Sequence, residues 1–85
     1  IRKMAYESIE NAVKNAIEYC VKNRFFMKLL NIATDESLSD NVRGEAGLEA
    51  LKILISDENN YVLKDIMYNP KIPQIVKESA KRLLR

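Results

Sequence analysis

Two stretches of this chain share one pattern, and that pattern decides the fold. Residues 35–46 have the sequence DESLSDNVRGEA, and residues 69–80, placed 34 positions later, have the sequence NPKIPQIVKESA. A repeat of this length is the usual size of one helix–turn–helix unit in a stacked helical array. We therefore predict related helical hairpins. The pairs that carry the repeat are Asp35 with Asn69, Leu38 with Ile72, Val42 with Val76, Arg43 with Lys77, and Ala46 with Ala80.

The composition around these stretches favours helices throughout. Eighty-five residues make one small domain, which we assign to residues 1–85. Hydrophobic residues make up 47% of the chain and charged residues 31%, as is typical of a folded domain. Only two glycines and two prolines occur among many helix-forming residues. We predict an all-α fold, a helical bundle or short α-solenoid of about five helices.

The N-terminal region, residues 3–34, precedes the first copy of the repeat. We predict a first helix over residues 3–22. Beyond it, Asn23 allows two alternatives, either one helix that continues to residue 33 or a break near residues 22–24. A continuous helix would be longer than most globular helices, which favours the break. The apolar face of the first helix is predicted from the spacing of Ile9, Val13, Ala16, Ile17 and Cys20.

Two turns frame the remaining helices. The turn near residues 35–40 offers Ser37, Ser39 and Asp40 as helix N-caps. The turn near residues 69–73 contains two prolines, and the second suits the first position of a final helix. Between them we expect a helix through about Ile55, a turn with Asp57 as cap, and a short helix, which together give two antiparallel hairpins. The inward residues of the final helix are predicted to be Val76, Ala80, Leu83 and Leu84.

Gly44 and Gly47 lie inside the predicted helix that comes after the first turn. Glycine within a helix costs about 1 kcal/mol relative to alanine. Close approach of a neighbouring helix would offset that cost, since a larger side chain would not fit. The alternative is that the glycines are simply tolerated, and the residue pattern leaves both interpretations open.

The segment from Asp35 to Leu51 resembles the second half of a HEAT-type repeat. That pattern has an acidic turn residue, a Val-Arg pair, and then alanines and leucines at helical spacing. In such families the turn acid and the arginine often form a ladder between neighbouring repeats. The resemblance implies that Arg43 and Lys77 occupy ladder positions, with Asp35 or Asp40 as the acid. The second copy departs from the pattern, because Asn69 replaces the acid and Lys77 the arginine.

A narrower resemblance covers roughly residues 27–85. Its residues are similar to those of a small uncharacterised archaeal family with two related helical hairpins. That family carries an Asn-Val-Arg turn and a later Asp-Pro-Asn-x-Pro turn. Ser39 stands where the family has a proline, and the spacing between the turns differs. The resemblance implies a fold and no activity. It rests on Leu29, Ile32, Asp35, Leu38, the Asn41-Val42-Arg43 turn, and residues 69–73, Asn-Pro-Lys-Ile-Pro.

Charge is distributed unevenly along the chain, although the net charge is only +2. Residues 1–28 carry six basic and three acidic groups, residues 29–70 three and eight, and residues 71–85 five and one. The basic C-terminal helix therefore suggests an alternative function, a small nucleic-acid-binding accessory protein. Against it, no aromatic residues alternate with the basic ones, and basic residues also complement a helix C-terminus. The candidate phosphate contacts are Lys71, Lys77, Lys81, Arg82 and Arg85.

The residues that carry catalysis are poorly represented. The chain has no histidine, and its one cysteine, Cys20, lies on an apolar stripe that favours a buried hydrophobic role. The acid pairs at residues 35–36 and 57–58 fall at predicted turns, where carboxylates cap helices. We therefore expect that the protein is not an enzyme and binds no cofactor and no metal. We also expect no membrane association. The free cysteine and the absence of a recognisable export signal favour the cytoplasm.

The aromatic residues of the N-terminal region suggest self-association. Two adjacent phenylalanines cannot both face one core on a helix, so one of Phe25 and Phe26 should pack inward and the other stay exposed or form a contact. With Tyr6 and Tyr19 they suggest a homodimer formed through the N-terminal helix. We predict a non-catalytic helical-repeat interaction or scaffolding module that binds an unidentified protein partner.

Overall fold

The computed structural model describes the backbone of residues 2–83 and the side chains of residues 9–83. The described residues form helices and turns, without a strand, which confirms the all-α prediction. The predicted break after the first helix is also confirmed, because residues 23–25 separate two helices. The helices are α1 Arg2–Lys22, α2 Phe26–Ala33, α3 Asp40–Ser56, α4 Asn60–Tyr68 and α5 Gln74–Leu83.

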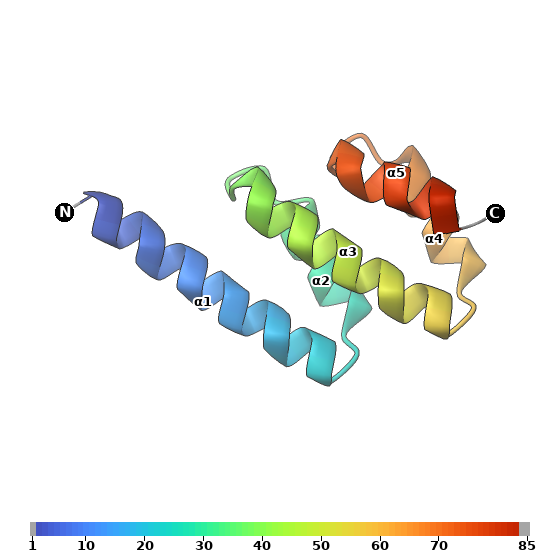
Figure 1. The fold of residues 1–85 in the computed structure, drawn as a ribbon, viewed down its shortest axis with the longest axis horizontal. Coiled ribbons are helices and arrows are strands. Elements are labelled where there is room, and N and C mark those ends of the chain that lie inside the picture. Colours follow the sequence, from blue (N-terminus) through green and yellow to red (C-terminus); the bar gives the residue numbers. More distant parts are fainter. Residues whose placement is uncertain (1, 84–85) are drawn as a thin grey trace.

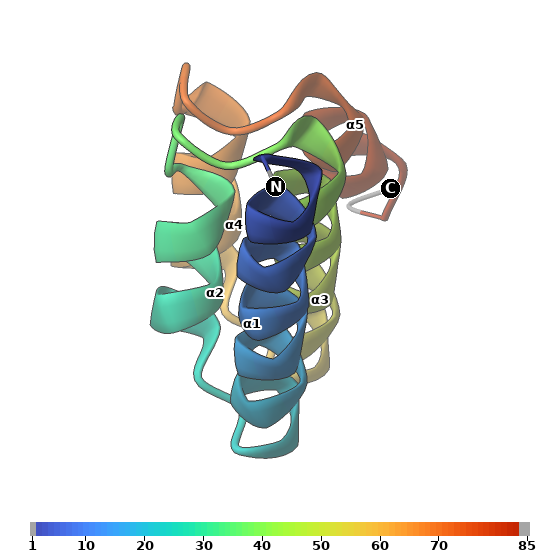
Figure 2. The ribbon, with the colours of Figure 1, turned by 90° about the vertical axis from the view of Figure 1, so that its left-hand side faces the viewer.

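The helices form two layers. Helices α1, α3 and α5 lie side by side in one layer and run in the same direction (Figure 1). Helices α2 and α4 form the second layer and run in the opposite direction (Figure 2). Helix α3 lies at the centre and packs against all four others, most extensively against α2. The arrangement is therefore a short array in which α2–α3 and α4–α5 are successive hairpins.

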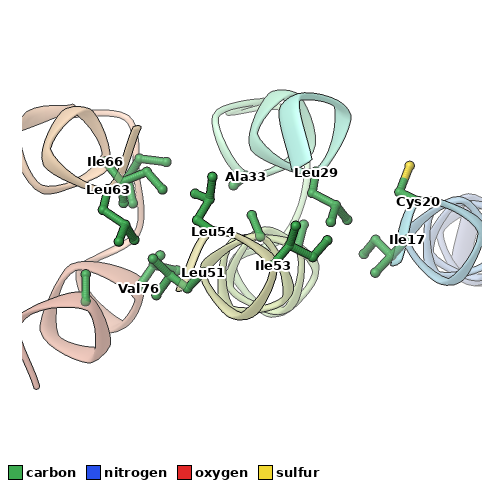
Figure 3. Close-up of a cluster of buried hydrophobic side chains, with 14 of the residues drawn as sticks. Ile17, Cys20, Leu29, Ala33, Leu51, Ile53, Leu54, Leu63, Ile66 and Val76 are labelled. Atoms are coloured by element: carbon green, nitrogen blue, oxygen red, sulfur yellow. The ribbon is translucent and has the colours of Figure 1, made fainter. Parts of the chain in front are cut away.

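The core follows the central helix along both of its sides. Figure 3 shows Leu51 of α3 and Val76 of α5 meeting between these two helices, while Leu29 of α2 extends toward α3 from the other layer. Leu54 of α3 and Leu63 of α4 are almost fully buried in the same cluster. Burying a side chain of this size contributes about 1.5–3 kcal/mol. Apolar burial on both sides of α3 therefore holds the two hairpins together.

The turn after α1 and the turn after α3 have the same backbone conformation. Arg24 and Glu58, which are 34 positions apart, both adopt the left-handed region, with φ of 57° and 56°. The N–H of Phe25 donates to the carbonyl five residues earlier at 2.8 Å, and the N–H of Asn59 does the same at 2.9 Å. Helix α1 is therefore a further copy of the helix type that α3 and α5 represent.

The helix caps differ from prediction at one position. Ser39 caps α3, because its side chain accepts a hydrogen bond from the N–H of Val42. Asp57, predicted to cap α4, instead ends α3, and the cap of α4 is Asn59, which accepts from the N–H of Val62. The prediction was wrong because the turn extends through Glu58 in the left-handed conformation, which moves the start of α4 two residues later.

The apolar face of α1 is only half covered. Val13, Ile17 and Cys20 pack against the core as predicted, but Ile9 is 53% exposed and Ala16 is also exposed. Helix α1 lies at one edge of its layer, so α2 and α3 cover only one side of its apolar arc (Figure 2). Leu83, predicted to point inward, is 55% exposed at the end of α5, and Leu84 lies outside the described residues.

The two glycines of α3 differ in their surroundings. A Cβ atom built on Gly47 would lie 2.6 Å from Cγ2 of Val76, a buried and branched side chain of α5. A Cβ atom on Gly44 would lie 3.5 Å from Cγ2 of Ile75, which is an ordinary contact distance. Close helix packing therefore explains Gly47, whereas Gly44 is tolerated.

Candidate functional site

A groove of about 340 Å³ runs between α2 and α4, the two helices of the second layer. Helices α2 and α4 each pack against α3 but make no comparable contact with each other. The groove is the space that remains between them. The floor of the groove is apolar, and its rim is polar except for Met27. The floor comprises Leu30, Val62, Ile66 and Ile72, and the rim comprises Met27, Asn31, Thr34, Asp65 and Asn69.

Some polar side chains of the rim are hydrogen-bonded within the protein, and others are accessible to a ligand. The hydroxyl of Thr34 donates to the carbonyl of Leu30 at 2.9 Å, and Oδ1 of Asn69 accepts from the N–H of Lys71 at 2.9 Å. Asn31 and Asp65 are exposed, and no hydrogen bond of their side chains is found within residues 9–83. The groove therefore presents one carboxamide and one carboxylate, from opposite walls, over an apolar floor.

Two tyrosines stand beside this groove on α4. Tyr61 is 88% exposed and Tyr68 is 82% exposed. With Asp65 they occupy positions four and three residues apart, which places all three on one side of the helix. Tyrosine is enriched among the residues that contribute most to protein–protein binding.

Arg43 fixes one end of the groove. Its Nε donates to the carbonyl of Ala33 at 3.0 Å, where α2 ends, and its Nη2 donates to the carbonyl of Lys71 at 2.5 Å, in the turn before α5. Its Nη1 also lies 3.4 Å from Oδ1 of Asp40. Because the next residues, Thr34 and Ile72, line the groove, one guanidinium holds its two walls together. Arg43 therefore connects the two repeats through a hydrogen bond to the backbone carbonyl of Lys71.

The remaining residues of the predicted ladder lie elsewhere. Asp35 accepts hydrogen bonds from the hydroxyl and the N–H of Ser37, at 2.6 and 3.1 Å. These bonds lower the pKa of the Asp35 carboxyl; desolvation raises it in part, and the charge of the nearby Arg43 lowers it by less than desolvation raises it. Lys77 is half-buried on α5, and it forms no ion pair with another described residue.

The predicted nucleic-acid residues do not reach the groove. Lys71 lies in the turn before α5, and Lys81 and Arg82 are exposed on the last turns of α5. Together with Lys77 they lie on or beside α5, whereas the groove lies between α2 and α4. Arg85 lies outside the described residues.

The residues predicted for self-association separate into two environments. Phe26 is half-buried against the core, whereas Phe25 is 38% exposed and its ring centroid lies 6.0 Å from that of Tyr19. Nζ of Lys28 lies 4.9 Å from the centre of the Phe25 ring. The side chain of Tyr6 lies outside those that the structure describes.

Groups with reactive chemistry do not assemble at any of these places. Cys20 is only 4% exposed, within the core. Within the part of the chain that the structure describes, no three histidine, cysteine or acidic residues lie close enough to hold a metal ion. No helix of the same residues is both long enough and apolar enough to cross a membrane.

Sequence reasoning did not identify the walls of the groove. Met27, Asn31 and Asp65 carry no motif, and only their positions on the outer sides of two amphipathic helices could have indicated them. It also missed that α1 belongs to the repeat, although Ala12, Ala46 and Ala80 are spaced 34 apart. Comparisons with protein-family models, with curated proteins and with solved structures find no match to this chain.

Proposed function

We propose that this protein is a non-catalytic helical-repeat interaction or scaffolding module that binds a segment of another protein in the groove between α2 and α4. The groove, with its apolar floor and accessible polar rim, is the observation that supports this function most directly. The 34-residue recurrence of helices and turns also supports the resemblance to HEAT-type repeats. Repeat proteins of this kind bind partners along the surfaces that their stacked helices create.

The groove favours a particular partner chemistry. An aliphatic or aromatic side chain of the partner would occupy the floor beside Leu30 and Ile66. A basic residue would pair with Asp65, and a backbone carbonyl or amide would bond the carboxamide of Asn31. Tyr61 and Tyr68 would contact the flanks of the bound segment. We therefore propose a short protein segment that combines an apolar anchor with an adjacent lysine or arginine.

Photo-crosslinking from the groove wall tests this function. A photoreactive amino acid is placed at Asn31 in the intact protein, and at Lys52 on α3 as a control outside the groove. Both positions are exposed. We expect Asn31, and not Lys52, to crosslink a protein from cell extract with nuclease present, and Asp65→Arg to abolish that crosslink. Equal crosslinking from both positions, or a crosslink unaffected by Asp65→Arg, would contradict the proposal.

The second candidate, nucleic-acid binding, is favoured by one observation. Lys71, Lys81 and Arg82 are exposed, and none of them pairs with an acidic residue inside the described region. If this function holds, replacing Lys77, Lys81 and Arg82 with glutamine should weaken binding across unrelated sequences and reduce the dependence of affinity on salt. Absence of binding to short duplex and single-stranded probes at low salt would exclude this candidate.

A further inference from the structure

One face of α1 has no helix packed on it among the described residues. It comprises Ile9, Ala12, Ala16 and Tyr19, whose spacing of three, four and three places them on one stripe of the helix. All four are exposed, Ile9 to 53% and Tyr19 to 59%. We call this stripe the open face of α1. An apolar stripe at helical spacing is ordinarily covered by another element, so its exposure requires an explanation.

The repeat shows what covers the same face elsewhere. Because α1 and α3 are copies separated by 34 residues, each position of the open face has an equivalent on α3. Three of these equivalents are buried in the core cluster, to which α2 and α1 both contribute, and α2 makes the most extensive contact with α3. The equivalents of Ala12, Ala16 and Tyr19 are Ala46, Ala50 and Ile53, which are 0%, 0% and 5% exposed.

The two established hairpins pair large side chains with small ones. Helix α2 brings Phe26 and Leu29 to the core, where α3 contributes Ala46 and Ala50. Helix α4 likewise brings leucine and isoleucine to the cluster that contains Ala80 of α5. Small side chains on the second helix of each hairpin let the first helix approach closely, and large side chains on the first helix fill the space.

We propose that the open face of α1 docks an amphipathic α-helix supplied by a partner protein, which takes the place on α1 that α2 takes on α3. The docked helix runs antiparallel to α1, as α2 does to α3 (Figure 2). It carries large aliphatic or aromatic residues at positions i, i+3 and i+4, in the manner of Phe26, Leu29 and Leu30 of α2. The docked helix and α1 would form an intermolecular pair of the same kind as the α2–α3 and α4–α5 hairpins. A second copy of α1 is a poorer occupant, since it would place alanine opposite alanine.

Charge at one end of the face specifies the partner further. Tyr19 contacts Phe25, and Lys28 lies over the Phe25 ring, so one cationic group stands beside the aromatic end of the face. A helix antiparallel to α1 begins near this end. An acidic residue in the first turn of the partner helix would pair with Lys28 and would also complement the dipole of that helix.

A peptide copied from this chain provides a defined probe. Residues 23–37 contain α2 with its flanking turns, and a hydrocarbon staple between positions 27 and 31, both exposed on α2, would hold the peptide helical without altering its apolar face. Fluorescence anisotropy of the labelled peptide is measured against the intact protein. We expect saturable binding that Ala16→Arg weakens by at least about tenfold. Asn60→Arg, a matched substitution at an exposed residue of α4 that does not line the groove, should leave the affinity unchanged.

Further controls separate docking from unfolding and from the groove. Circular dichroism should show that Ala16→Arg retains its helical content, and Ala12→Arg should reproduce its effect. A peptide with Leu29→Asp should not bind. Asp65→Arg, which disrupts the α2–α4 groove, should not alter peptide binding, so this proposal and the proposed function can fail independently. Binding that is absent, or insensitive to both alanine variants, would overturn the proposal. A dimer in light scattering that Ala16→Arg dissociates would assign the face to a second copy instead.

Discussion

Single side chains decide how closely the helices pack, and the two glycines of α3 illustrate this. Gly47→Ala would place a Cβ atom 2.6 Å from Val76, and buried Val76 cannot rotate away. We expect the overpacking to lower the free energy of unfolding by about 1–3 kcal/mol, despite the better helix propensity of alanine. Gly44→Ala has room and should be neutral or stabilise by up to about 1 kcal/mol. Chemical denaturation of both variants measures the difference, and equal effects would contradict the packing argument.

The three equivalent alanines give a second test at single positions. Ala46 and Ala80 are both completely buried, so replacing either with leucine should cost about 1–3 kcal/mol of stability through overpacking. Ala12 is the equivalent position on α1 but is exposed, and Ala12→Leu should change stability by less than about 0.5 kcal/mol. Thermal melts compare the three variants. An unchanged melt for Ala46→Leu and Ala80→Leu would contradict the repeat itself.

Among the elements, the turns are held by side chains that differ in importance. Arg43 is only 14% exposed and bonds two backbone carbonyls in different hairpins, so Arg43→Gln should destabilise by about 1–3 kcal/mol. Arg43→Lys should not restore stability, because an ammonium lacks the planar fork. Arg24 pairs with Asp57 but is 51% exposed, so Arg24→Gln should cost less than about 1 kcal/mol. Urea denaturation measures the free energy of unfolding of each variant. A larger loss of stability for Arg24→Gln than for Arg43→Gln would contradict this ranking of the two side chains.

The turn before α3 should make stability depend on pH. The bonds from Ser37 hold the pKa of Asp35 below its ordinary value of 3.8, so the folded state favours the ionised carboxylate. That contribution is fully present above about pH 4 and is lost as the pH falls through the lower folded-state pKa. The stability difference between the protein and Asp35→Asn should therefore be constant from pH 7 to about 4 and shrink below it. An NMR titration that gives Asp35 an ordinary or raised pKa would contradict this prediction.

In the whole molecule, the protection of backbone amides against hydrogen exchange should fall from the centre of the array toward α1. Among the described helices, α3 packs against each of the others, whereas α1 contacts α2 and α3 and leaves its open face exposed. Amide hydrogen exchange should therefore be slowest in α3 and faster in residues 9–16 of α1. Binding of the stapled α2 peptide should slow exchange in α1 specifically. Equal protection of α1 and α3 in the free protein would show that the open face is already covered.

Local patterns were sufficient to predict most of the elements. The 34-residue repeat, the sparse glycine and proline, and the three candidate caps near residues 37–40, of which Ser39 is the cap, predicted the helices and the turns that separate the hairpins. Helix periodicity and capping act within a few residues, so they are visible in a linear sequence. The resemblance to HEAT-type repeats and the homodimer stay predictions, because they concern likeness and association rather than local structure.

The groove and the open face, in contrast, arise only when the elements pack. Ile9 and Ala16 belong to the same apolar pattern as buried Ile17, and only the edge position of α1 leaves them exposed. Asn31 and Asp65 are distant in sequence and become two walls of one groove because α3 holds α2 and α4 next to each other. Which part of an amphipathic face is covered depends on the neighbours that a helix acquires, and periodicity within that helix carries no information about them.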